Sequence, residues 1–166
     1  MDVTTGDPIY PKVDRHTHKL MFEKKGVEIP AYPTEQIIAE KLSATFSYGT
    51  DNLRAKDYYD LFTIPKLESL DDKELYKSVR NTFTKRGYTK PLSFYYEREI
   101  NQIKDNEQLK NQWDKYRTVN SFAETIQYSD TVKEIDCLMK TVIQVEKHER
   151  KIKLQRTRHV NREMKR

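Results

Sequence analysis

Five charged side chains fall within a short stretch of the sequence and could act together on a phosphorylated substrate. They are Lys41, Arg54, Lys56, Asp57 and Asp60. Lysine and arginine bind phosphate oxygens, and a carboxylate can orient a hydroxyl, a base or a lysine. The structural alternative is a set of ion pairs that links two helices and fixes how they cross. Spacing alone leaves both interpretations open.

Two short helices joined by a polar loop are expected to carry these side chains. The first begins at Thr34, and its apolar residues recur at helical spacing: Ile37, Ile38, Leu42, Ala44, Phe46. Residues 47–52 read as a loop. The second helix begins near Leu53 and must end just before Pro65, because proline disfavours helix continuation.

Helical spacing relates the charged residues to one another. Asp57 and Asp60 are three positions apart and share one face of the second helix. Arg54 precedes Asp57 by three residues and Lys56 precedes Asp60 by four, which are both ion-pair spacings. Lys41 lies beside the apolar stripe of the first helix, from which it can reach across to the second.

The remaining sequence predicts an α+β fold that is mainly helical. Short strands are expected at residues 2–5 and as a hairpin within residues 12–31. Further helices are expected over 73–85, over 91–113 with an interruption at 104–106, and from about Phe122 onward. The strands are too few for an independent sheet, so we expect them to form the edge of a larger α/β unit.

Charge is concentrated at the C-terminus. The net charge is +5, but residues 147–166 alone carry nine Lys/Arg against two Glu, which leaves the rest slightly negative. We therefore expect a β element at residues 1–31, a helical domain at 32–146 and a basic tail at 147–166, which is either a fraying, solvated helix or a disordered end. No signal peptide or long apolar run is visible, so a cytoplasmic protein without membrane contact is expected.

Cysteine and histidine offer little chemistry in this sequence. The single cysteine, Cys137, rules out an intrachain disulfide and reads as a small buried hydrophobe. His16 and His18 would share one strand face and could form a metal pair. No third ligand lies near them in sequence, so a solvated strand face is the better interpretation.

Two segments resemble a known family. E-Q-I-I-A-E-K-L-S-A, at residues 35–44, and R-A-K-D-Y-Y-D-L, at residues 54–61, are similar to later motifs of the AbiEii/AbiGii toxin family. D-V-T-T-G-D-P-I, at residues 2–9, resembles a preceding strand of that family. Its members are nucleotidyltransferase-like toxins of type IV toxin–antitoxin and abortive-infection (phage-defence) systems. The resemblance therefore implies transfer of a nucleotidyl group from an NTP to an acceptor hydroxyl such as that of tRNA.

The resemblance also implies roles for individual residues. Asp57, Lys41 and Asp60 would be catalytic, and Arg54 and Lys56 would bind the nucleotide or its phosphates. Asp2 would be the strand carboxylate that completes a Mg²⁺ site. A cognate antitoxin would be the protein partner.

The sequence departs from the family pattern at the phosphate-binding and metal-binding motifs. The family has a Gly-Gly-Ser/Thr turn followed by an Asp-x-Asp pair, whereas the four glycines here are all isolated and no Asp-x-Asp occurs. We therefore expect the C-terminal part of a truncated or split enzyme, inactive alone, to which an N-terminal fragment must supply the Mg²⁺ site. The alternative is a non-enzymatic helical module that binds nucleic acid through its basic residues.

Overall fold

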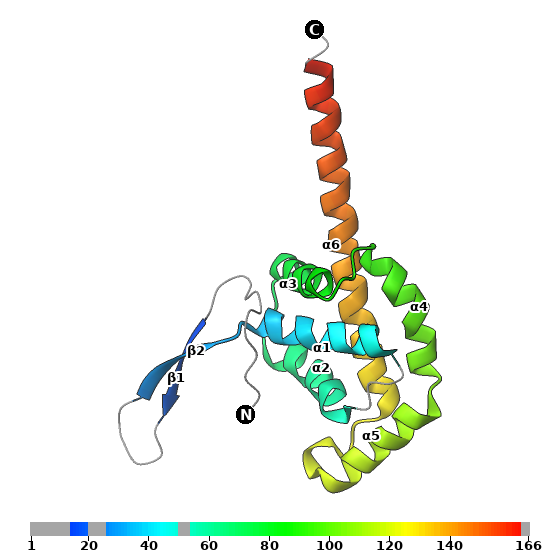
Figure 1. Ribbon diagram of the computed structural model, residues 1–166. Helices are drawn as coiled ribbons and strands as arrows, with labels where there is room; N and C mark the ends of the chain where they lie inside the picture. Colours follow the sequence, from blue (N-terminus) through cyan, green and yellow to red (C-terminus); the bar gives the residue numbers. More distant parts are fainter. Residues whose placement is uncertain (1–13, 20–25, 50–53, 164–166) are drawn as a thin grey trace.

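The computed structural model describes residues 14–19, 26–49 and 54–163 (Figure 1). The expected hairpin is present: β1 (Asp14–Lys19) pairs antiparallel with β2 (Gly26–Ala31), with Asp14 opposite Ala31. The helices are α1 (Thr34–Tyr48), α2 (Ala55–Leu67), α3 (Asp72–Lys85), α4 (Leu92–Lys104), α5 (Glu107–Val119) and α6 (Tyr128–Glu163). The mainly helical α+β class is confirmed, and the strand expected at residues 2–5 lies outside the described residues.

The hairpin stands to one side of the helical body (Figure 1). Every residue of β2 from Gly26 to Pro30 is exposed, including Val27 at 48% and Ile29 at 41%. Successive strand residues point to opposite faces, so neither face of β2 is covered by the described residues. The side chains of His16 and His18, the candidate metal pair, lie outside what the structure describes.

Apolar residues at helical spacing form the buried face of α1. Ile38, Leu42 and Phe46 recur every four residues, and all three are fully buried. Helix α1 packs mainly against α3 and also contacts α2 and α4. Gly49 ends the helix with φ +52° and ψ −123°, a conformation that only glycine adopts readily, and its N–H donates to the carbonyl of Thr45.

Helix α3 begins and ends where the sequence predicts. The carboxylate of Asp71 accepts hydrogen bonds from the backbone N–H groups of Lys73 and Glu74, both at 2.9 Å. Gly87 follows the helix with φ +83°. Leu75, Val79 and Phe83 recur every four residues and form the buried face.

Helix α6 is the central helix of the body. It packs against α2, α3, α4 and α5, and its buried face includes Ile135, Met139 and Val142. The helix then continues without a break and projects away from the body (Figure 1). The basic segment that begins at Lys147 is therefore helical through Glu163, and a helix was one of the two expected alternatives.

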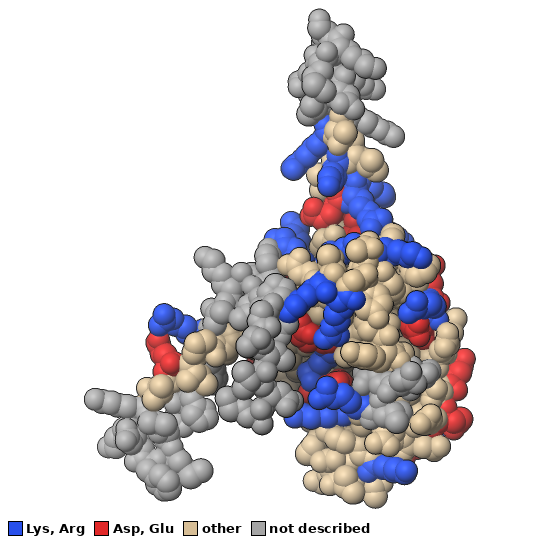
Figure 2. Space-filling model, in the orientation of Figure 1, with Lys and Arg blue, Asp and Glu red and all other residues tan. Residues whose placement is uncertain are grey.

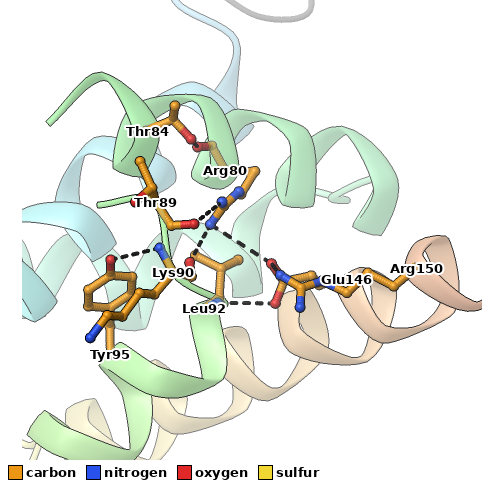
Figure 3. A network of polar contacts seen from close by, with 8 residues as sticks. All are labelled: Arg80, Thr84, Thr89, Lys90, Leu92, Tyr95, Glu146 and Arg150. Carbon is orange, nitrogen blue, oxygen red and sulfur yellow. Dashed lines mark hydrogen bonds and ion pairs between the residues drawn. The ribbon is translucent and has the colours of Figure 1, made fainter. Parts of the chain in front are cut away.

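A buried carboxylate fixes α6 at the point where it leaves the body (Figure 3). Glu146 is 3% exposed and accepts hydrogen bonds from the backbone N–H of Leu92 at 3.0 Å and from Arg150 at 3.1 Å. Arg80 lies 3.9 Å from the same carboxylate and donates to the carbonyls of Thr89 and Lys90. These contacts join α3, the start of α4 and α6, and so set the direction of the projecting segment.

Two local predictions were wrong. Helix α2 includes Pro65 in its last turn and extends to Leu67, because Lys66 bonds to Glu134 of α6 at 2.7 Å and Ile64 packs against the core. Cys137 is exposed, since it lies on the face of α6 opposite the buried stripe.

The interruption between α4 and α5 falls at residues 105–106, as predicted. No described helix has the length and hydropathy of a membrane span.

Candidate functional site

Helices α1 and α2 bring four of the predicted site residues together. The ammonium of Lys41, on α1, donates a hydrogen bond to Asp57 Oδ1 at 3.0 Å and lies 2.6 Å from Asp60 Oδ2, both on α2. Arg54, at the start of α2, places its Nε 3.8 Å from Asp57 Oδ2. An ion-pair network between the two helices is therefore present.

Lys56 lies apart from this cluster. It is exposed on α2, and no ion pair joins it to any described residue. Asp60, the partner suggested by the four-residue spacing, is bonded instead to Lys41 of the other helix. Helical periodicity located the two aspartates correctly, but it could not decide which cation would reach them.

The two aspartates keep the partly buried Lys41 protonated. The Lys41 side chain is 18% exposed, and the side chains of Asp57 and Asp60 are 9% and 21% exposed. Burial by itself lowers the pKa of Lys41, but the hydrogen bonds and negative charges of Asp60 and Asp57 outweigh it and raise the pKa above its usual value. Lys41 can therefore hold an anion or orient a carboxylate, but it cannot serve as a neutral base near pH 7.

A pocket of about 350 Å³ opens beside the cluster. Its wall combines cationic, acidic and apolar side chains from α1, the start of α2 and the residue after α3: Tyr32, Gln36, Ile37, Glu40, Lys41, Ala44, Arg54, Asp57, Arg86. We call this space the α1 pocket. Three cations, Lys41, Arg54 and Arg86, reach it from three separate segments of the chain.

The opposite wall of the α1 pocket is a polar network that sequence reasoning missed. Glu40 accepts hydrogen bonds from Gln36 at 3.0 Å, Thr82 at 3.1 Å and Arg86 at 2.6 Å. Gln36 is 1% exposed, and its Oε1 has no hydrogen-bond partner among the described residues. The four-residue spacing of Gln36 and Glu40 on α1 was the available signal, but Thr82 and Arg86 are more than forty residues away in sequence.

A second pocket of about 500 Å³ lies on the other side of Arg54. We call it the α2–α5 groove, because it is lined by the start of α2 and by one face of α5: Arg54, Ala55, Lys56, Gln112, Lys115, Tyr116, Val119. Arg54 lines both spaces. Lys56 thus belongs to the groove and not to the α1 pocket.

The described residues do not by themselves form a magnesium site. No group of three or more His, Cys, Asp or Glu side chains suited to a metal occurs among them. Asp57 and Asp60 are the carboxylates nearest to such an arrangement, but the Lys41 ammonium already lies at hydrogen-bond distance from an oxygen of each. Asp2, the predicted metal ligand, lies outside the described residues.

Comparison with protein families decides the identity. The model of the family described as nucleotidyl transferase AbiEii toxin, type IV TA system, matches residues 1–134. The chain belongs to this family. No curated protein and no solved structure matches it.

The residues matched by the family model include both the hairpin and the whole charged cluster. The matched residues extend from the N-terminus into the first turns of α6, so the AbiEii match contains Lys41, Arg54, Asp57 and Asp60. The basic projecting segment of α6 lies beyond the match. A toxin of a type IV system implies an antitoxin partner.

Proposed function

We propose that the chain is the nucleotide-handling part of a toxin that transfers a nucleotidyl group from an NTP to an acceptor such as tRNA. The observation that carries this proposal is the convergence of Lys41, Arg54 and Arg86 on the α1 pocket in a member of the AbiEii family. In such a transfer the acceptor hydroxyl oxygen bonds to the α-phosphorus, pyrophosphate leaves, and the hydroxyl loses its proton.

The charged side chains around the pocket have distinct roles in this proposal. Arg54 and Arg86 contact the nucleotide phosphates, because guanidinium groups bind phosphate oxygens in a bidentate manner. Lys41 is held between two carboxylates and orients them, and Asp57 and Asp60 in turn fix Lys41 toward the bound nucleotide.

The proposal includes a second polypeptide. The sequence has neither the Gly-Gly-Ser/Thr turn nor the Asp-x-Asp pair of the family. Near the pocket, Asp57 and Asp60 are engaged with Lys41, and Glu40 is engaged with Arg86. An N-terminal fragment that carries those motifs would supply the Mg²⁺ site. No described residue covers either face of β2, and this supports such a partner, because a two-stranded hairpin is marginally stable unless something packs on it.

Nucleotide binding tests the pocket without requiring turnover. A fluorescent NTP analogue titrated with the chain should bind, and the Arg54→Gln/Arg86→Gln variant should weaken that binding at least tenfold. Lys110→Gln, at an exposed lysine of α5 outside the α1 pocket, is the matched control and should bind like the parent chain. Equal affinity for all three proteins would refute the assignment of the pocket.

Turnover tests the requirement for a partner. We expect no transfer of label when the chain is incubated alone with Mg²⁺, labelled NTPs and total tRNA. Transfer should appear when a polypeptide with the Gly-Gly-Ser/Thr and Asp-x-Asp motifs, encoded by DNA upstream of Met1, is added. Labelling by the chain alone would refute the split-enzyme proposal.

A non-enzymatic nucleic-acid-binding module is the second candidate, and one observation favours it. The projecting segment of α6 carries five Lys/Arg and one Glu between residues 147 and 157 (Figure 2 shows these blue side chains). Its charged residues are exposed and are available to phosphates. Binding that is tight, salt-steep and lost on deletion of residues 147–166 would support this candidate.

A further inference from the structure

The α2–α5 groove has the composition of a site for a polyanion. Lys56 and Lys115 are both exposed, and neither forms an ion pair with another described residue. Arg54 adds a third cation, and none of the described residues that line the groove is acidic. Lys56 and Lys115, which have no ion-pair partner among the described residues, face one space, so they repel one another and favour a bound anion.

One residue of the groove lining, Tyr116, belongs to an aromatic cluster. Tyr116 lies in the lining, and its ring centroid is 5.6 Å from Trp113, 6.2 Å from Tyr59 and 6.3 Å from Phe122. Trp113 is 1% exposed, and its indole N–H donates to the carbonyl of Ile126 at 3.0 Å, so it anchors the cluster in the core. Phe122 is 58% exposed at the outer edge. The aromatic surface is therefore rigid and partly open to solvent.

The groove and the α1 pocket meet at Arg54, beside the ion-pair network of Lys41, Asp57 and Asp60. Arg54 lines both spaces, and Asp57, to which it is paired, lines the α1 pocket. On the groove side, burial and the negative charge of Asp60 raise the pKa of Tyr116, and Asp60 is one of the two carboxylates held by Lys41. A reaction that joins two substrates needs two such neighbouring sites.

We propose that the α2–α5 groove binds the single-stranded end of the acceptor RNA, with its phosphates on Lys56 and Lys115 and a base stacked at Tyr116. Cationic side chains combined with an aromatic platform are the usual means of holding single strands, because every base has a stacking face. The strand then leads past Arg54 toward a nucleotide in the α1 pocket. This inference rests on the proposed nucleotidyl transfer and adds where the second substrate lies.

Binding of an oligonucleotide tests the groove in the absence of NTP and metal. The probe is a fluorescein-labelled single-stranded 12-mer RNA, followed by anisotropy at several salt concentrations. Lys56→Glu/Lys115→Glu should weaken binding more than tenfold near 0.1 M salt and reduce the magnitude of the salt slope by about 1.4, the value for two lost phosphate contacts. Lys110→Glu, an exposed lysine on α5 outside the groove, is the matched control and should lower affinity less than threefold.

Substitutions at Tyr116 separate stacking from charge. Tyr116→Phe keeps the ring and should bind like the parent chain, whereas Tyr116→Leu loses the stacking surface and should weaken binding about tenfold. Thermal unfolding of each variant shows whether the fold is intact, and Tyr116→Phe provides the rescue if Tyr116→Leu is destabilised. Equal affinity of the phenylalanine and leucine variants would refute the stacking role.

Three results would overturn the inference. These are equally tight binding of a duplex of the same length, full competition by a poly-glutamate peptide, and loss of RNA binding only when residues 147–166 are deleted. The first excludes a single-strand site, the second indicates an acidic protein as the ligand, and the third places the RNA on α6.

The groove and the proposed reaction can fail separately. The chain could bind RNA through Lys56 and Lys115 and still show no transfer in the presence of the complementing polypeptide. That result would support the groove as an RNA site and refute the nucleotidyl transfer. Transfer whose KM for the acceptor is unchanged by Lys56→Glu/Lys115→Glu would support the reaction and refute the groove.

Discussion

Replacing Lys41 with methionine tests whether the ion-pair network holds α1 and α2 together. Methionine keeps most of the apolar length of the lysine side chain but leaves Asp57 and Asp60 without the ammonium that bonds to both. The Asp57 side chain, only 9% exposed, retains Arg54 at 3.8 Å as its remaining cation. The variant should be folded and markedly less stable.

The burial of the three charged groups sets the expected loss. Removing one partner of a fully buried ion pair costs about 3–5 kcal/mol, whereas an exposed pair contributes at most about 1 kcal/mol. The side chains of Lys41, Asp57 and Asp60 are 18%, 9% and 21% exposed, so they lie between these limits but nearer the first. We therefore expect Lys41→Met to lower the free energy of unfolding by about 2–3 kcal/mol.

Urea unfolding followed by circular dichroism measures this loss. A variant in which all three charged side chains are replaced by neutral ones identifies its origin. Lys41→Met/Asp57→Asn/Asp60→Asn removes the stranded carboxylates along with the lysine, so it should regain most of the lost stability. Lys110→Met is the control, because its pair with Glu107 is long, at 3.8 Å, and exposed. That control should change stability by at most about 0.5 kcal/mol.

The pH dependence has a definite sign. Because the pKa of Lys41 is raised in the folded protein, its contribution is full below the unfolded value of about 10.4 and disappears as the pH rises through the folded value. The stability difference between the parent chain and Lys41→Met should therefore be constant from neutral pH to about pH 10 and decrease only above that. A loss no larger than that of Lys110→Met, or a difference that vanishes near neutral pH, would refute this reasoning.

Further substitutions test other parts of the fold. Gly49→Ala should destabilise the chain by about 1–3 kcal/mol in urea unfolding, because a Cβ disfavours φ +52° with ψ −123°; an unchanged midpoint would contradict the glycine requirement. Glu146→Gln should cost about 1–3 kcal/mol and speed hydrogen exchange at the start of α4, since it weakens the acceptor that fixes α6; unchanged exchange there would argue against this role. The pKa of Asp136 is lowered, because hydrogen bonds from Lys140 and Tyr96 outweigh burial. Asp136→Asn should therefore be less stable than the parent chain above pH 4 but equally stable once the pH falls through the lowered pKa, and a gap that persists in strong acid would be contrary evidence.

Local patterns in the sequence determined most of the helical body. Four-residue apolar spacing placed α1 and α3, the side chain of Asp71 and the conformation of Gly87 set the ends of α3, and the polar residues after Lys104 separated α4 from α5. These features depend on neighbours within one or two helical turns, so the sequence carries them directly. The family resemblance, carried by short motifs at residues 35–44 and 54–61, was confirmed by the family match.

Two predictions from the sequence patterns, the end of α2 and the burial of Cys137, were wrong. Pro65 stays inside α2 because an ion pair to α6 and core packing hold its last turn, and Cys137 is exposed because α6 turns a different face toward the body. Local propensity cannot anticipate the first result, since it depends on residues distant in the chain. Helical periodicity does anticipate the second, since Cys137 lies opposite the buried residues Ile135, Met139 and Val142 of its own helix.

The candidate site was determined in part by sequence and in part by tertiary structure. Sequence placed Lys41, Asp57 and Asp60 on two adjacent helices, since helical periodicity governs which side chains share a face. Only the tertiary structure joined Asp60 to Lys41, brought Arg86 into the α1 pocket and assigned Lys56 to a groove with Tyr116 of α5. The physical reason is that a pocket forms where helices distant in sequence cross, and core packing sets that crossing.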